Sequence, residues 1–251
     1  MSKRIWMLAA LLMAVPAAAR EPVQRPSIDP KAEQVLRRMS GYLASLESFR
    51  VETEIVDELV LKNGQKLQEV SESRVAVKRP NRLRSDRLGP VADVTFRYDG
   101  NEFSIYGKRT GMYATAAAPP DIDRAIDVAR DKLGIYAPGG DLLYSDPYAV
   151  LTEDAFEGTY VGLEPLAGVN CHHLAFRGKD VDWQIWVQDG PQPLPRRYQI
   201  TSKNDPGQPE FAVDLSHWDP QANVSDQEFT FAPPAGATRI PFLTRGNTAS
   251  R

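Results

Sequence analysis

The sequence has very few of the residues from which covalent cross-links and metal sites are built. Its 251 residues include one cysteine, Cys171, and three histidines. A single cysteine excludes an internal disulfide, and a structural zinc site normally requires four ligands. The fold must therefore be stabilised by the packing of its core, for which a chain of this length is sufficient.

Long apolar segments are also missing. The longest apolar run, residues 5–15, would form a helix of about 16 Å, too short for a hydrocarbon core about 30 Å thick. Lys3 and Arg4 precede this run, and Pro16 and the small residues 17–19 follow it. That order is typical of a cleaved signal peptide over residues 1–19, so we expect export to the periplasm.

A large excess of charge is absent as well. Acidic residues number 33 and basic residues 30, which gives a formal net charge of −3. A nucleic-acid-binding domain usually carries clustered positive charge, so we expect no nucleic-acid partner. The sequence has neither a phosphate-binding glycine loop nor a Gly-x-Ser-x-Gly elbow, so we expect no cofactor and no catalytic serine. The expected oligomeric state is a monomer.

Two parts of the chain have the apolar spacing of helices. Asp29 is a candidate N-cap, and Val35 and Met39 lie on the apolar face of the helix that follows it. Residues 20–28 have no periodicity and are interpreted as a flexible tether. A second helical segment lies in an insertion over about residues 119–154, where it interrupts a series of strands.

Most of the remaining sequence alternates between apolar and polar residues, which is typical of β-strands with one solvent-facing side. Turn signals such as Asp99-Gly100 separate roughly ten short strands, the last at residues 228–231. Because flat sheets of that size are unusual, we expect one large curved antiparallel sheet, with the helices covering its concave face. The prediction is a mainly β (α+β) single domain over residues 29–243, followed by a disordered tail at 244–251.

Metal or thiol chemistry has one candidate constellation. Cys171 and His173 share one face of a predicted strand, so these two residues and His217 could serve a metal- or thiol-dependent enzyme. Three ligands are too few for a structural zinc site, and a cysteine in mid-strand is more often buried and inert. His217 is in phase with the apolar Val213 and Leu215, which favours a hydrogen-bonded histidine on a core face. We therefore predict no catalytic residue and no metal site.

A basic run lies after the first predicted hairpin. It consists of Lys78, Arg79, Arg82, Arg84 and Arg87. The plain interpretation is the solvated rim of a sheet. The alternative is a contact with anionic lipid headgroups or with a partner protein, as expected for a periplasmic sensor or scaffold protein.

Several predicted strands carry apolar side chains at alternate positions. Trp183 and Ile185 share one face, and Phe103 and Ile105 share another in the same way. Such faces line either a filled core beneath the helices or an apolar cavity that the helices cover reversibly. The pattern leaves both open, because a core and a cavity require the same side chains.

Three segments resemble the LolA family of periplasmic lipoprotein carriers. They are residues 77–81 (Val-Lys-Arg-Pro-Asn), the strand–Asp-Gly–strand unit that starts at Tyr98, and residues 229–236 (Phe-Thr-Phe-Ala-Pro-Pro-Ala-Gly). Residues 182–187 and 193–198 are similar to a family of predicted periplasmic proteins of unknown function. That family lies within the same LolA/LolB/LppX-like superfamily.

The resemblance implies an unclosed barrel of antiparallel strands with helices as a lid over an apolar cavity. It implies that Arg79 bonds to the lid and holds it closed. The carrier has an aromatic residue where this chain has Leu83, which leaves the ligand undefined. The ligand-binding residues expected on this basis are Leu83, Phe103, Ile105, Val181, Trp183, Ile185, Tyr198 and Ile200, and the expected lid residues are Ile122, Ile126, Ala129 and Leu133.

The sequence therefore supports one leading hypothesis and two alternatives. The leading hypothesis is a non-enzymatic carrier or binding protein for an acyl chain, a lipid or a lipoprotein, with a membrane or a lipoprotein as a further partner. The first alternative is a sensor or scaffold of the same fold that binds a protein. The second is the enzyme that uses Cys171, His173 and His217.

Overall fold

A computed structural model describes residues 27–135, 137 and 139–242. The predicted signal peptide and tail, and all of the tether except its last two residues, lie outside the described residues. The tether ends in contact with the sheet, where Ile28 forms an isolated parallel bridge with Gly158. None of the described helices is long and apolar enough to cross a membrane.

Twelve strands of the described chain form one sheet. They are β1 (Ser48–Val60), β2 (Lys66–Lys78), β3 (Arg82–Leu88), β4 (Asp93–Tyr98), β5 (Glu102–Gly107), β6 (Met112–Ala117), β7 (Ala155–Leu166), β8 (Val169–Gly178), β9 (Val181–Gln188), β10 (Pro195–Ser202), β11 (Glu210–Asp219) and β12 (Thr238–Arg239). The helical elements are α1 (Pro30–Ser45), α2 (Ile122–Asp131), η1 (Gly140–Leu143), α3 (Pro147–Thr152) and η2 (Asp226–Glu228).

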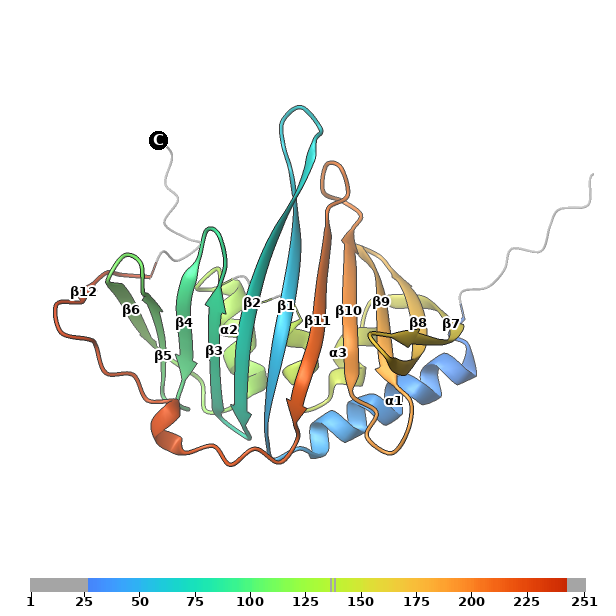
Figure 1. Cartoon of the computed structure of the whole chain (residues 1–251), viewed down its shortest axis with the longest axis horizontal. Helices are drawn as coiled ribbons and strands as arrows, with labels where there is room; N and C mark the ends of the chain where they lie inside the picture. The colour runs from blue at the N-terminus through green and yellow to red at the C-terminus, as the bar shows by residue number, and fades with distance from the viewer. Residues whose placement is uncertain (1–26, 136, 138, 243–251) are drawn as a thin grey trace, which may run out of the picture.

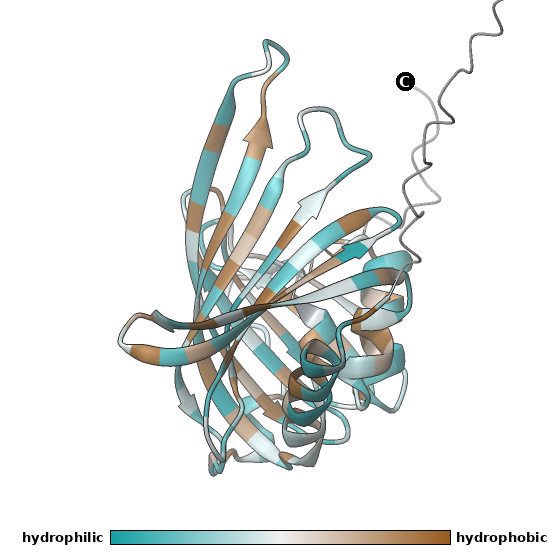
Figure 2. Cartoon of the chain, turned by 90° about the vertical axis from the view of Figure 1, so that its right-hand side faces the viewer, coloured by the Kyte–Doolittle hydropathy of each residue, from teal (hydrophilic) through white to brown (hydrophobic). Residues whose placement is uncertain are grey.

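The sheet is curved and does not close. Its strand order is β12-β6-β5-β4-β3-β2-β1-β11-β10-β9-β8-β7, so β12 and β7 are its two edges. Every pair is antiparallel except β12 with β6, which is parallel. Figures 1 and 2 show the curvature, with the helices on the concave side. The predicted mainly β fold with one unclosed antiparallel sheet is confirmed.

Helix α1 begins where the sequence predicts. The Asp29 carboxylate accepts a hydrogen bond of 2.7 Å from the Lys31 backbone N–H, and Pro30 occupies the first turn, where its missing N–H has no cost. Its buried face includes Leu36 and Met39, which are fully enclosed. This face packs against β7, β9 and α3.

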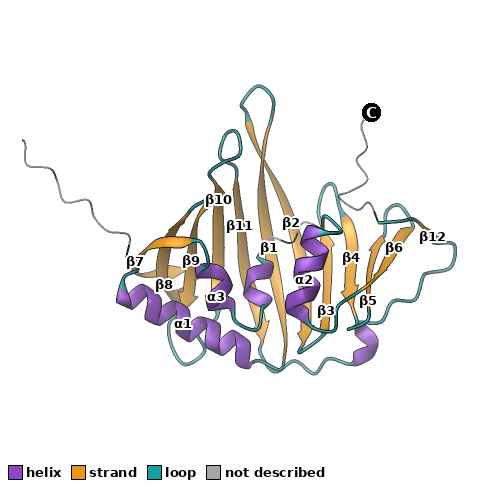
Figure 3. Cartoon of the chain, turned by 180° about the vertical axis from the view of Figure 1, so that it is seen from behind, coloured by secondary structure: helices purple, strands orange, loops and turns teal. Residues whose placement is uncertain are grey.

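The insertion forms α2, η1 and α3 in succession. The carboxylates of Asp121 and Asp146 cap the two α-helices through the N–H groups of Arg124 and Ala149. Figure 3 shows α2 in front of β2 and β3, while α1 and α3 lie in front of the other end of the sheet. The concave face therefore has two differently covered halves.

The predicted final strand at residues 228–231 is wrong. The segment begins at the last residue of the short helix η2, which Ser225 caps, and Phe229 packs with Ala76 on the convex face of the sheet. Phe229 and Phe231 alternate because they pack at two different sites, Phe229 with Ala76 and Phe231 against Tyr113. No strand of the described part of the chain pairs with this segment. Strand β3, hidden within the basic run, was not predicted.

The core-facing position predicted for His217 is also wrong. The register of β1 against β11 shifts between Arg50 and Glu52, and His217 has a left-handed φ of 49° at this bulge. The extra residue rotates the His217 side chain out of phase with Leu215. Its side chain is 77% exposed, and its Nδ1 lies 3.2 Å from a Glu52 carboxylate oxygen.

Candidate functional site

A cavity of about 810 Å³ lies between the β1–β6 half of the sheet and the lid, the name used here for α2, η1 and the described residues between them. Its volume is within the range of small-molecule and lipid sites. The strands that contribute are β1 to β6 and β11, and the lid contributes α2, η1 and the segment between them. Its lining includes Phe49, Val51, Ile55, Val75, Leu83, Val94, Phe96, Tyr98, Phe103, Ile105, Ala114, Leu142, Val213, Leu215 and Trp218.

The lid presents its apolar face to the cavity. The four predicted lid residues recur at helical spacing, and all four line the cavity: Ile122, Ile126, Ala129 and Leu133. Polar contacts join parts of the lid to one another: Tyr144 donates to Asp127 at 2.6 Å, Arg130 donates to Asp141 at 2.9 Å, and the Ser145 backbone N–H donates to Asp123 at 2.9 Å. The lid is therefore an element with its own internal contacts, separated from the sheet by the cavity.

Arg79 and Pro80 fasten both ends of the lid to the sheet. The Arg79 guanidinium donates to the carbonyl oxygens of Leu143 (2.9 Å) and Tyr144 (3.2 Å). At the other end, the Ile122 backbone N–H donates to the Pro80 carbonyl oxygen at 3.0 Å. Burial lowers the pKa of Arg79 from its ordinary value. The placement of Arg79 is the one that the resemblance implies for a latch.

The structure divides the eight expected ligand-binding residues between the two halves of the sheet. Three of them line the cavity: Leu83, Phe103 and Ile105. The other five are absent from its lining and pack in the core: Val181, Trp183, Ile185, Tyr198 and Ile200. Helices α1 and α3 fill that half directly, and Phe176 stacks on Trp183 with ring centroids 4.1 Å apart. The two halves have the same alternating sequence pattern and differ in which helix covers them.

The sequence did not predict four polar side chains of the cavity or the apolar residues that line it from the segment after β12. The polar residues are Thr53, Ser73, Ser85 and Arg87, and the apolar residues are Ile240, Pro241 and Phe242, which follow β12. Thr53 is in phase with Phe49 and Val51 in the sequence, so alternation places it on the inner face. Nothing local indicates that the chain after β12 returns to the cavity.

The Cys-His-His segment lies on β8, away from the cavity. Cys171 is buried and forms no disulfide, and burial raises the pKa of its thiol. His173 stacks on Trp186 at 4.1 Å, and its Nδ1 lies 3.2 Å from a Glu164 oxygen. His217 is on β11, on the far side of two other strands. Among the described residues, no three metal-ligating side chains are grouped.

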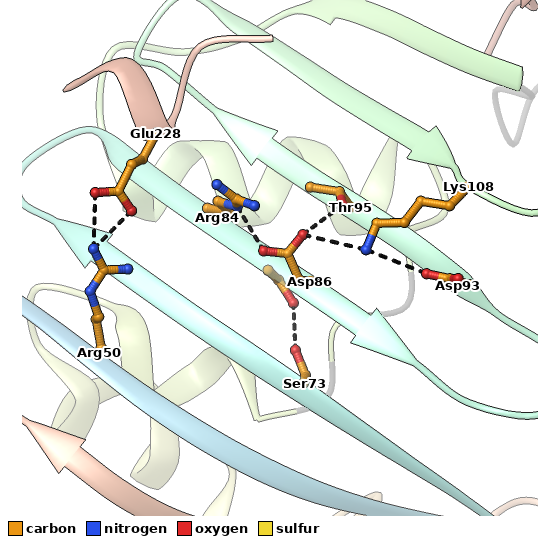
Figure 4. A network of polar contacts seen from close by, with 9 residues as sticks. Arg50, Ser73, Arg84, Asp86, Asp93, Thr95, Lys108 and Glu228 are labelled. Carbon is orange, nitrogen blue, oxygen red and sulfur yellow. Dashed lines mark hydrogen bonds and ion pairs between the residues drawn. The ribbon is translucent and has the colours of Figure 1, made fainter. Parts of the chain in front are cut away.

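Much of the basic run is neutralised by carboxylates of the same chain. Arg84 donates to Asp86 at 2.7 Å, and Lys78 lies 2.7 Å from Asp226. Figure 4 shows the network around Asp86 on the outer face of β3. The Asp86 carboxylate also accepts a hydrogen bond of 2.6 Å from the Thr95 hydroxyl. The run therefore presents less free positive charge than the sequence indicates.

Tyr98 connects the sheet to the start of the lid and gives a pH-dependent prediction. Its hydroxyl donates to the Pro119 carbonyl at 2.7 Å, and burial raises its pKa to about 12. Because the folded-state pKa lies above the ordinary value, the stabilisation is complete below about pH 10 and is lost as the pH rises toward 12. Between those values the free energy of unfolding should fall about 2–3 kcal/mol more for the wild type than for Tyr98→Phe. Denaturant unfolding at several pH values measures the difference, and parallel curves would contradict it.

Comparisons with known proteins agree with the geometry. A family model described as "Predicted periplasmic protein (DUF2092)" matches residues 32–243. Among curated proteins, none matches the sequence. An uncharacterized conserved protein from Thermus thermophilus is similar in structure, with 12% identity and a TM-score of 0.50 over 84% of this chain and 99% of that chain. That likeness shows a shared fold.

Two further solved structures are more distant. Lipoprotein LppX from Mycobacterium tuberculosis has 12% identity and a TM-score of 0.44, over 78% of this chain and 100% of that chain. A LolA superfamily protein from Nitrosomonas europaea has 12% identity and a TM-score of 0.42, over 80% of this chain and 97% of that chain.

Proposed function

We propose that this chain, which belongs to the DUF2092 family of predicted periplasmic proteins, is a periplasmic carrier for a hydrophobic ligand. The ligand is an acyl chain, free or part of a lipid or lipoprotein, held between the curved sheet and the lid. The observation that carries this proposal is the apolar cavity of about 810 Å³ beneath α2. A packed core leaves no void of this size, because protein interiors are close-packed.

The energetics of such a site are favourable without any charge pairing. Each methylene group transferred from water into an apolar site contributes about 0.8 kcal/mol. An acyl chain of ten or more carbons could therefore bind tightly even after the loss of its conformational freedom. Binding to the protein would shield the chain from water outside the cytoplasm.

The lid contacts support reversible closure. The sheet-to-lid hydrogen bonds described above are few, and they lie at the ends of the lid, at Arg79, Pro80 and Tyr98. Opening would therefore break a small number of bonds while the internal contacts of the lid persist. Entry and release of a ligand require this combination.

The alternatives have less support from the geometry. A partner-binding sensor or scaffold would use the basic run, and Arg84 and Lys78 are paired internally. An enzyme based on Cys171, His173 and His217 would need these side chains together, and β11 is separated from β8 by β9 and β10.

Native mass spectrometry tests the proposal. The full-length precursor would be expressed in a bacterial host, purified from the periplasmic fraction without detergent, and sprayed under non-denaturing conditions. We expect a fraction of the protein to carry one lipid-sized adduct that is lost on delipidation and regained with a fluorescent acyl-chain ligand. Protein that repeatedly carries no lipid and takes up no acyl chain would contradict the proposal.

The latch gives a kinetic prediction. Arg79→Ala removes both hydrogen bonds to the lid and leaves the carbonyls of Leu143 and Tyr144 without these partners. Since a hydrogen bond to a charged group contributes about 1.5–3 kcal/mol, we expect acyl-chain dissociation to be at least about tenfold faster. Stopped-flow displacement of the fluorescent ligand measures this rate. Arg82→Ala is the control, because the Arg82 guanidinium bonds to its neighbour Asn81. Equal rates in the wild type and Arg79→Ala would show that Arg79 is no latch.

A further inference from the structure

The inner face of β1, β2 and β3 changes from apolar to polar along the strands. At one end of the cavity, Val77 and Leu83 are paired across β2 and β3. Toward the other end, the cavity-facing positions of the same strands are Ser73, Ser85 and Arg87. The register pairs Thr53 with Ser73, and Ser85, whose own partner is Val75, lies diagonally beside Ser73. These three hydroxyl-bearing side chains form a band across the sheet, which we call the hydroxyl band: Thr53, Ser73 and Ser85.

The hydroxyl band is buried yet has unused hydrogen-bonding capacity. Ser73 and Thr53 are 4% and 9% exposed. The Ser73 and Ser85 hydroxyls lie 2.9 Å apart, so one donates to the other. Two hydroxyls carry two protons, and their mutual bond uses one. A second proton and several lone pairs therefore remain for a group inside the cavity.

The charged residues beyond the hydroxyl band are already balanced. Arg87 donates to the Asp57 carboxylate at 2.7 Å and to the Ser71 hydroxyl at 3.0 Å. Glu69 is paired in register with Asp57 and shares its face of the sheet. An incoming carboxylate would thus meet one arginine that already has an internal partner, with the carboxylates of Asp57 and Glu69 behind it, outside the cavity lining. This end of the cavity disfavours an anionic head group and suits an uncharged one.

We propose that the ligand is an acyl ester with an uncharged, hydroxyl-bearing head group, such as a glyceryl ester, bound in one orientation. Its ester and hydroxyl groups lie at the hydroxyl band, and its chain extends toward Leu83, Phe103 and Ile122 at the apolar end. This inference rests on the proposed carrier function and specifies the chemical class of the cargo. The remaining hydroxyl proton of the Ser73–Ser85 pair is donated to the ester carbonyl oxygen. A hydrocarbon chain alone offers no acceptor for this proton.

The experiment compares two ligands with the same chain. Delipidated protein is titrated at pH 8 with laurate and with its glycerol monoester, below their micellar concentrations. We expect the wild type to bind the ester at least about tenfold more tightly than laurate. In the double variant Ser73→Ala/Ser85→Ala, the ratio of the two affinities should be about tenfold smaller. Ser104→Ala is the matched control, because Ser104 is 2% exposed on β5 and is absent from the cavity lining.

A variant that removes a negative charge tests the same inference through a gain in affinity for the carboxylate ligand. Asp57→Asn leaves Arg87 without its carboxylate partner, so we expect laurate to bind about tenfold more tightly than to the wild type. Equal affinities of the wild type for both ligands, or a double serine variant that keeps the preference, would overturn the inference and leave the carrier function standing. If neither ligand binds and no lipid co-purifies, the carrier function fails and this inference fails with it.

Discussion

Replacing Ala129 with tryptophan is expected to weaken acyl-chain binding about 100-fold or more. Ala129 lies on the cavity-facing side of α2 and is 5% exposed. An indole group at this position would occupy space that the chain requires. If it displaces about four methylene groups at about 0.8 kcal/mol each, the loss is about 3 kcal/mol, or roughly two orders of magnitude in affinity.

The control is the same substitution on a helix outside the cavity. Ala149 lies on α3 with its side chain exposed, so Ala149→Trp should bind like the wild type. Fluorescence titration gives both affinities, and the melting temperature shows that each variant is folded. An Ala129→Trp protein that is folded and binds normally would show that the ligand does not lie beneath α2.

Truncating Ile185 is expected to cost about 2–5 kcal/mol of unfolding free energy and to leave ligand affinity unchanged. Ile185 has no exposed surface and lies in the half of the sheet that α1 and α3 fill. Removing its side chain creates a void in close-packed surroundings. The ligand does not contact this half, so the folded variant should bind within about twofold of the wild type, a difference that corresponds to about 0.4 kcal/mol.

Ile105→Ala is the matched variant in the other half. Ile105 borders the cavity and is partly exposed, so truncation widens a space that already exists. We expect a stability loss of about 1 kcal/mol, below the range for packed sites, and an affinity several-fold weaker. Urea unfolding and titration of the two variants give the full comparison. Equal effects of the two substitutions on binding would contradict the division of the sheet into a packed half and a hollow half.

The sequence predicts most of the elements because their signals are local. The cap at Asp29 and the helical spacing of the lid residues depend on neighbours within a few positions, and both features are present in the structure. Strand β9 (Val181–Gln188) carries the apolar face predicted for Trp183 and Ile185, because strict alternation defines it. The curvature was expected from the number of strands, whereas the open edges were implied by the resemblance to the LolA family.

The site was predicted only in part because it depends on long-range packing. Ile105 and Ile185 occupy equivalent positions in alternating strands, and only the helix above each one decides whether it faces a void or a neighbour. The bulge that turns His217 outward arises from the register of β1 against β11, which are far apart in the sequence. The Phe229 contact with Ala76 is long-range in the same way.

Photo-crosslinking with an acyl ligand tests the central claim most directly. A glyceryl ester whose chain ends in a diazirine would be bound to the purified full-length protein, irradiated, and located by peptide mass spectrometry. We expect labels in two regions, residues 122–135 of the lid and residues 94–105 of β4 and β5, and competition with unlabelled ester should reduce both. Labels confined to residues 181–200, or no label above that of an irradiated control without ligand, would contradict it.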